Sequence, residues 1–440
     1  MNVHSRPAAA YPAWGPASRH GDVQSLTDMG DIQIRRLREE DFPEVVRVEG
    51  AAFGEQAAPE EVAVFRAGFN VDRTLCAVED GALVGTNSVM DMELTVPGDR
   101  VIPVAALTWV GVLPSHRRRG IFRRLMERQL EDIRHGGDIV SVLLGSEGGI
   151  YGRFGYGSAT SVLSFSLERP QAKLAGPFGN DGRIVLIDPA GAASVLPDVY
   201  DRYRRRQIGA MSRHPGWWTE YLYDIEHHRE RTGKMFHAVH ENAAGSRDGY
   251  VTYRIEQHWS AGLPSGELVV VELIAADPEV YAALWSYCLN TDLVRTISMG
   301  RGRVEEPLRW LLTGSRSLQV DGLVDYLWVR LIDLPRALAA RDYYSPGDLV
   351  LEVTDDVFQA NSGRYRLRVE APGGTALCAP TAADPQLALS VAELGAVYLG
   401  GVSFQTLAAA GRVKELSGGA LANADLMFAT DTPPYCVTMF

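Results

Sequence analysis

The sequence predicts a chain of mixed α/β and α+β class with two or three domains, and three observations lead to this prediction. First, its 440 residues exceed what one ordinary hydrophobic core holds. Second, a strand, a proline and a helix follow one another at residues 107–130 and again at 266–289, as in layered α/β domains. Third, the pattern changes from about residue 336 to alternating strands and short helices, which indicates a domain of another class.

The first segment starts after an N-terminal stretch that carries no periodicity. Residues 1–30 are rich in proline, alanine and serine, so we expect a disordered tail there, and Met29 is an alternative start. The first domain is expected over residues 31–170, with Asp80-Gly81 turning a hairpin. Its strands are expected at 31–37, 75–78, 82–89, 92–96, 101–112 and 138–144, and its helices at 39–53, 60–69 and about 118–134.

The second segment, residues 180–335, repeats this order without the basic residues. A buried strand at 266–276 leads through Asp277-Pro278 into a helix at 279–289. Asp277 and Glu279 lie where a bound anion would need positive charge. We therefore expect no anion-binding site at this turn.

The third segment, residues 336–440, is expected to form a separate small domain. Two alternating stretches are joined through Asn361-Ser-Gly363, and three short helical stretches follow. The strands are expected at 349–353 and 364–369, and the helices at 391–398, 404–410 and 423–428.

Composition excludes several classes of protein. With 46% hydrophobic and 22% charged residues, the composition is typical of a globular protein. No apolar run reaches the length of a membrane span. The start lacks an apolar signal core, and the four cysteines show no paired spacing, so we expect reduced thiols and a cytoplasmic protein. A net charge of −12 argues against non-specific nucleic-acid binding and suits a cationic substrate. The cysteines are Cys76, Cys288, Cys378 and Cys436.

The most informative stretch is Leu107–Arg128, in which an apolar strand, a basic turn and a helix follow directly. The unpaired N–H groups of a helix start attract anions, arginines add bidentate donors, and Gly120 allows close approach. One interpretation is a pyrophosphate cradle, and the other is a solvated basic helix start. The order of the elements favours the cradle, to which Arg117, Arg118, Arg119 and Gly120 contribute.

Two motifs carry a resemblance to a known family. Arg117-x-x-Gly120 matches the coenzyme signature of the GNAT acetyltransferases, although Phe122 stands where glycine or alanine is usual. The run V-x-V-x-P-x-H-R-R-R-G at 110–120 and the run SEGGIYGRFGYG at 146–157 resemble the enhanced intracellular survival (Eis) branch of that superfamily.

The resemblance implies a fold and an activity. The fold would be two GNAT-like domains, the second without a coenzyme site, followed by a sterol-carrier-like domain. The activity would be transfer of acetyl from acetyl-CoA to an amine, such as an aminoglycoside or a lysine-type amine, in a homohexamer. Two alternatives remain: a GNAT enzyme for another amine metabolite, and a lipid-binding or scaffold protein that uses the C-terminal domain.

Coenzyme contacts follow from the same motifs. Ser146 has two equally good interpretations, a contact to the thioester end or the N-cap of a helix opened by Glu147. Tyr151 is either the acid that protonates the departing thiolate or a core aromatic residue, and the resemblance favours the acid. The expected coenzyme-binding residues are Val110, Val112, Arg117, Arg118, Gly120, Ile121 and Ser146.

Other kinds of catalytic site are not indicated. The histidines lack an H-E-x-x-H pattern, so we expect no metal. No G-x-S-x-G nucleophile elbow occurs, which favours direct attack in a ternary complex over a covalent acyl-enzyme.

The acceptor pocket and its base are expected at distant parts of the chain. Phe53, Glu55 and Phe65 are candidate pocket walls, and Glu55 either attracts an ammonium group or is a solvated loop acid. The chain stays apolar up to Phe440, so burial would carry its α-carboxylate inward as a base, a role that the resemblance also implies. The alternative is a final strand that only packs in the core. Met439 replaces the acidic residue common in aminoglycoside-modifying members, which counts against multi-amine antibiotics.

Overall fold

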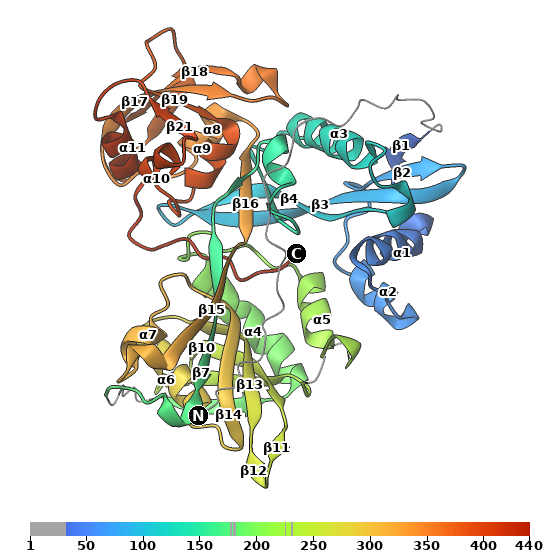
Figure 1. The fold of residues 1–440 in the computed structure, drawn as a ribbon, viewed down its shortest axis with the longest axis vertical. Helices are drawn as coiled ribbons and strands as arrows, with labels where there is room; N and C mark the ends of the chain where they lie inside the picture. The colour runs from blue at the N-terminus through green and yellow to red at the C-terminus, as the bar shows by residue number, and fades with distance from the viewer. Residues whose placement is uncertain (1–31, 177, 179–181, 225, 230–231) are drawn as a thin grey trace, which may run out of the picture.

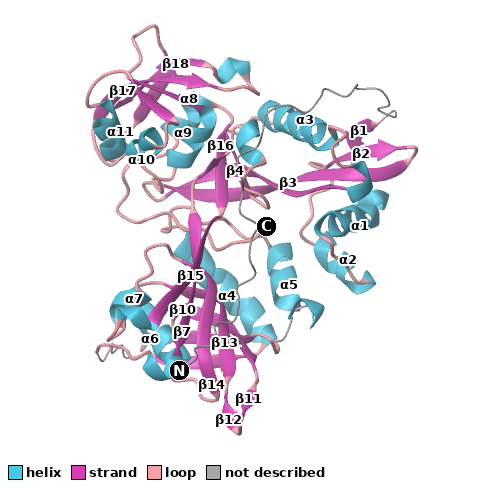
Figure 2. Cartoon of the chain, in the orientation of Figure 1, coloured by secondary structure: helices cyan, strands magenta, loops and turns pink. Residues whose placement is uncertain are grey.

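The computed structural model describes residues 32–176, 178, 182–224, 226–229 and 232–440, so the expected tail at 1–30 lies outside the described residues. Figure 1 shows three bodies: a first sheet flanked by helices, a second sheet with its own helices below it, and a small C-terminal domain beside the first sheet. Figure 2 shows the strands of all three bodies in magenta, each with helices against them. Within these residues no helix is both long and apolar enough to cross a bilayer.

The first sheet has seven strands in the order β1-β2-β3-β4-β5-β16-β6. Alternate residues of its strands face opposite sides: Cys76 and Leu83 pack with α1, whereas Leu75 and Val84 pack with α3. The stretches expected at 82–89 and 92–96 form one long strand, β3, paired with β4 along almost its full length. The elements of this domain are β1 (Gln33–Arg36), α1 (Phe42–Phe53), α2 (Pro59–Arg66), β2 (Leu75–Glu79), β3 (Ala82–Val96), β4 (Arg100–Val112), α3 (Ile121–His135), β5 (Val140–Leu144), η3 (Tyr151–Phe154), β6 (Gly157–Ser158) and β16 (Leu327–Leu331).

The second sheet also has seven strands, in the order β15-β7-β14-β13-β10-β9-β8. Two strands cross the expected domain boundaries. Residues 161–168, expected in the first domain, form β7 of the second sheet, and residues 327–331, expected in the second domain, form β16 of the first sheet. The elements are β7 (Ser161–Glu168), β8 (Arg183–Ile187), α4 (Pro189–Arg204), α5 (Pro215–Tyr223), β9 (Phe236–Glu241), β10 (Arg247–Glu256), β13 (Gly266–Ala275), α6 (Pro278–Leu289), β14 (Val294–Gly302), α7 (Leu308–Leu311) and β15 (Leu318–Asp325), with a small hairpin of β11 (Trp259–Ser260) and β12 (Leu263–Pro264).

The C-terminal domain is a five-stranded sheet, β19-β18-β17-β20-β21, covered by short helices. Its core is continuous with that of the first sheet, because one cluster of buried side chains includes both Val142 and Leu351. A buried ion pair, Arg330–Asp355, joins β16 to the loop after β17. The elements are α8 (Leu334–Ala339), β17 (Gly347–Thr354), β18 (Gly363–Val369), β19 (Ala376–Pro380), β20 (Leu387–Ser390), α9 (Val391–Val397), α10 (Phe404–Ala409), β21 (Val413–Glu415) and α11 (Ala420–Phe428).

Candidate active site

Strand β4 is open on one side at its carboxyl end. Its parallel pairing with β5 runs only from Ala105–Ser141 to Leu107–Leu143. Beyond that point β4 has a bulge, because the pairing with β3 shifts and Trp109 takes a left-handed φ of 52°. The Thr86 hydroxyl donates to the Trp109 carbonyl oxygen at 2.7 Å and fixes the bulge. The two strands therefore separate, and the backbone at Val110 is free of β5, as a coenzyme arm that binds along a strand edge requires.

The basic turn lies directly beyond this open end. Gly120, with a left-handed φ of 76°, is the residue before α3, and a side chain added there would meet open space. Arg118 is exposed and also left-handed, with a φ of 63°. Ile121 is buried and Val112 is nearly so, which leaves their backbone groups for any coenzyme contact.

The three arginines of the turn are not equivalent. Arg119 forms a bidentate ion pair with Glu79, with Nη–Oε distances of 2.9 and 2.5 Å, and this pair lowers the pKa of the Glu79 carboxyl. Arg117 donates to the carbonyl oxygen of Ala52 at 2.6 Å, which ties the turn to α1. Arg119 therefore holds the turn to β2, whereas Arg118 is exposed, and the contribution of each to anion binding stays a prediction.

Tyr151 lies in the same cluster of side chains as Val110. It is 5% exposed, and its ring packs edge-on against Phe122, with centroids 6.2 Å apart. Burial raises the pKa of the Tyr151 hydroxyl, while its hydrogen bond with Ser146 lowers that pKa. The hydroxyl therefore stays protonated near neutral pH and can donate a proton.

Ser146 does not cap a helix, and its contact with the coenzyme stays a prediction. Residues 145–150 form turns, and the next helical element is the short 3-10 turn η3, so the expected helix at Glu147 is absent. The N-cap interpretation of Ser146 is thus wrong. The hydrogen bond to Tyr151 gives Ser146 a different role, that of orienting the phenol.

Tyr156 is a different case from Tyr151, although it is close by. It is fully buried, its hydroxyl lies 2.8 Å from the Ser141 hydroxyl, and burial raises its pKa to about 12. Its hydroxyl group is therefore buried and hydrogen-bonded within the core.

The C-terminal tail lies between the first and second sheets, next to α5 (Figure 1). Residues 435–438 are buried, as the apolar sequence predicted. The Tyr435 amide donates to the Ile208 carbonyl at 2.8 Å, Arg213 donates to the Thr438 hydroxyl at 3.0 Å, and Trp217 donates to the Met439 carbonyl at 2.6 Å. Met439 is 58% exposed, whereas the Phe440 ring packs against the core of the first domain.

An aromatic pocket of about 240 Å³ adjoins this tail. Trp217 and Tyr221 stack with ring centroids 5.0 Å apart, and Phe65 contributes from α2 of the first domain. Arg213, whose guanidinium lies over the Trp217 ring at 4.0 Å, forms a buried ion pair with Glu272. Val437 and Met439 also line the pocket, so the chain end is part of its wall.

Carboxylates beside this pocket are held in unusual protonation states. Glu49 lies on α1 over Gly111 of β4, and burial, followed by the charges of Glu55 and Glu220, raises its pKa to about 7. Glu220 lines the pocket; part of its side chain is accessible, but the concave wall removes water and raises its pKa to about 7. Three carboxylates so close together would attract a cationic amine.

The structure brings together most of the predicted site residues, from distant parts of the chain. Phe65 lines the pocket, and Glu55 acts on Glu49 through charge. Phe53 is 51% exposed and is not among the lining residues. Sequence reasoning missed Glu49 and Glu220, because no local pattern distinguishes them from solvated helix acids.

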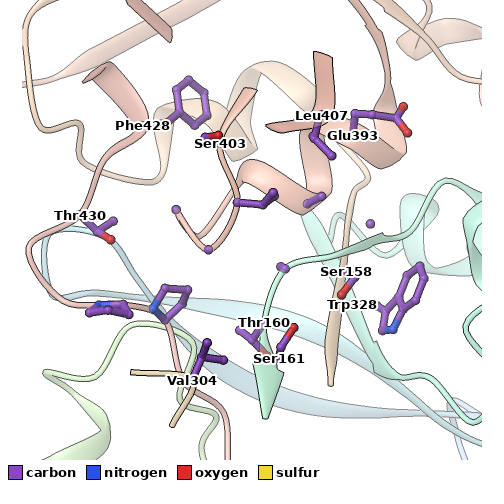
Figure 3. Close-up of a pocket in the computed structure, with 18 of the residues that line it drawn as sticks. Ser158, Thr160, Ser161, Val304, Trp328, Glu393, Ser403, Leu407, Phe428 and Thr430 are labelled. Atoms are coloured by element: carbon purple, nitrogen blue, oxygen red, sulfur yellow. The ribbon is translucent and has the colours of Figure 1, made fainter. Parts of the chain in front are cut away.

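A larger cleft of about 810 Å³ lies between the first sheet and the C-terminal domain (Figure 3). Trp328 and Ser158 line it from the first sheet, and Phe428 and Thr430 line it from the C-terminal domain. Its lining includes an ion pair between Glu393 and Arg412, with a nitrogen–oxygen distance of 2.5 Å. The interior of the C-terminal domain is filled by its own side chains.

Among the described residues, no group of three or more histidine, cysteine, aspartate or glutamate side chains is arranged so that it could hold a metal ion. The four cysteines are free thiols, and burial raises the pKa of Cys76 to about 11.

Comparisons with known families match three consecutive parts of the chain. Residues 33–159 and 209–331 each match a family described as an acetyltransferase (GNAT) domain. Residues 334–437 match the sterol carrier protein domain.

Individual relatives match almost the whole chain. The N-acetyltransferase Eis of Mycobacterium tuberculosis is 33% identical over 407 residues, which cover 90% of this chain and 96% of the relative. An uncharacterised N-acetyltransferase of Streptomyces coelicolor is 38% identical over 411 residues, covering 92% and 98%. The crystal structure of Eis1 from Mycobacterium abscessus superposes with a TM-score of 0.81 at 34% identity, covering 93% of this chain and all of that one.

Proposed function

The chain belongs to the Eis family of acetyl-CoA-dependent N-acetyltransferases, and from that premise we propose that it acetylates an amine of a cationic small molecule by direct attack in a ternary complex. The predicted fold class is confirmed: two GNAT domains precede a sterol-carrier-like domain. The observation that carries the proposal is the open end of β4 with the Tyr151 hydroxyl beside it.

The coenzyme would bind across the open end of β4. Val110 and Val112 would offer backbone groups to its pantetheine arm, and the N–H groups that start α3 would face its pyrophosphate. Arg118 would add a charge-assisted contact, and Gly120 leaves room for close approach. The coenzyme supplies the activated acetyl group.

Two protein groups would then handle protons. Tyr151, kept protonated by burial and oriented by Ser146, would give a proton to the departing sulfur. The Phe440 carboxylate, carried inward by the anchored tail, would accept the proton of the attacking amine.

The acceptor class follows from the pocket between the two GNAT domains. Its aromatic wall of Trp217 and Tyr221 suits an ammonium group or an apolar stem. Glu220 lines the pocket and Glu49 lies within charge interaction of it; both have a pKa of about 7, and a bound cation would favour their ionised form. A cavity of about 240 Å³ fits a lysine-type amine more readily than a whole aminoglycoside. The homohexamer and the cytoplasmic location stay predictions.

The alternative of a lipid carrier has weaker support. A carrier needs an apolar cavity, whereas the side chains of the C-terminal domain pack into a continuous buried core and the cleft beside it contains the ion pair of Glu393 and Arg412.

The experiment is a thiol-release assay with acetyl-CoA and a panel of amines. We expect turnover with compact lysine-type diamines and less with bulky aminoglycosides. As a control, the same panel is run with Glu220→Gln, which should raise KM for cationic acceptors but leave acetyl-CoA affinity unchanged. Absence of acetyl-CoA binding by calorimetry would overturn the proposal.

A further inference from the structure

A second cavity, of about 720 Å³, lies in the second GNAT domain where α4, α6 and α7 approach the end of β13. It shares no lining residue with the acceptor pocket. Its volume is in the range usual for small-molecule sites. Much of its wall is apolar, including Val199, Leu273, Ala275, Pro278 and Leu311.

Four arginines line this cavity: Arg202, Arg205, Arg206 and Arg303. Arg205 is ion-paired with Asp201 at 2.9 Å. Among the residues that the structure describes, the other three have no carboxylate partner within ion-pair distance. Unpaired guanidinium groups gathered in one cavity of a chain with net charge −12 indicate a site for an anion.

The guanidinium group of Arg303 is positioned by uncharged hydrogen-bond partners. It donates to the Gln207 amide oxygen at 2.8 Å and to the Tyr203 hydroxyl at 3.0 Å, and it lies over the Tyr435 ring at 4.7 Å. These contacts fix the guanidinium in position and leave its charge uncompensated. Arg206, next to Gln207 in the chain, is exposed at the rim.

The two aspartates of the wall are already engaged. Asp277 accepts a hydrogen bond from the Val280 amide at 2.9 Å, and Asp248 contacts His240 at 2.5 Å. Asp277 thus occupies the start of α6, where a phosphate would otherwise bind. The negative charges of Asp248 and Asp277 would also repel a ligand with several negative charges, so the cavity favours a ligand with a single negative charge.

We propose that this cavity binds an organic monocarboxylate with an apolar body. The carboxylate pairs with Arg303 and Arg206, and the body lies on Leu273, Ala275 and Pro278. This site is separate from acetyl transfer and gives the arginines of the cavity a role in a domain whose strand–helix turn carries no basic cradle.

The test uses octanoate as the probe and full-length protein, followed by isothermal titration calorimetry. We expect saturable binding of one octanoate per chain, and a Kd that rises about tenfold or more in Arg303→Gln and in Arg206→Gln, as loss of a charge-assisted hydrogen bond predicts. Arg316→Gln, an exposed arginine of the same domain outside the cavity wall, is the matched control and should leave Kd unchanged. 1-Octanol, which has the same body without the charge, should bind far more weakly.

Several outcomes would overturn the proposal: no octanoate binding, equal affinity for octanol, or equal Kd values in Arg206→Gln and Arg316→Gln. Since Arg206 is exposed, its variant decides the matter even if Arg303→Gln fails to fold. A second acetyl-CoA per chain that is lost in Arg206→Gln would also overturn it, because the cavity would then be a coenzyme site.

Discussion

Replacing Tyr151 with phenylalanine removes one hydroxyl group and little else. The ring contacts with Phe122 and Tyr156, at centroid distances of 6.2 and 6.4 Å, do not depend on the hydroxyl. The hydrogen bond with Ser146 is lost, which costs about 0.5–1.5 kcal/mol of stability. A large loss of activity with a small loss of stability would thus point to chemistry and not to folding.

The expected kinetic effect is much larger than the effect on stability. A positioned general acid contributes ~10²–10⁴ in rate, so kcat should fall by that factor while acetyl-CoA affinity hardly changes. This loss corresponds to roughly 3–6 kcal/mol of transition-state stabilisation, at about 1.4 kcal/mol for each factor of ten. Steady-state thiol release measures kcat, and calorimetry measures coenzyme affinity.

Tyr156→Phe is the matched control for Tyr151→Phe. It removes a hydroxyl from the same cluster, one that is bound to Ser141 at 2.8 Å, while Ser141 keeps its bond to the Ala105 carbonyl at 2.9 Å. We expect a similar small loss of stability and nearly unchanged kcat. The reasoning fails if Tyr151→Phe retains wild-type kcat, or if both variants lose activity equally.

Three further predictions concern the coenzyme turn, the chain end and the acid cluster. Arg118→Ala should weaken acetyl-CoA binding by about 1–3 kcal/mol in calorimetry, whereas Arg119→Ala should mainly lower the Tm, because Arg119 is paired with Glu79; the reverse pattern would refute the assignment. One glycine added after Phe440 should abolish turnover without loss of folding or coenzyme binding, since the anchors at residues 435–439 remain; full turnover would exclude the terminal carboxylate as base. In the folded protein the pKa of Glu49 is raised from 4.5 to about 7, so ionising Glu49 costs more free energy in the folded state than in the unfolded state. Its contribution to the free energy of unfolding therefore falls as pH rises from about 4.5 to 7. Glu49→Gln should therefore raise the free energy of unfolding at pH 8 but not at pH 4, by about 1–2 kcal/mol after allowance for its partial exposure, as thermal unfolding at the two pH values would reveal.

The sequence predicted local features well and long-range pairing poorly. The strand, turn and helix from Leu107 to Arg128 were found because hydrophobic period and turn residues are local signals. The sequence analysis assigned β7 and β16 to the wrong sheets, because the residues of a strand do not determine which other strand it pairs with. The same holds for Glu49 and Glu220, whose charges interact only once the first and second domains have come together.

The exchanged strands also limit how this protein can be divided. Strand β16 provides β5 with its second neighbour and is the partner of β6, although it is encoded after the whole second sheet. A fragment that stops near residue 160 would leave β5 as an open edge, prone to aggregation. On the ribosome the first sheet stays incomplete until residue 331 has emerged, so the first GNAT domain is finished only after the second.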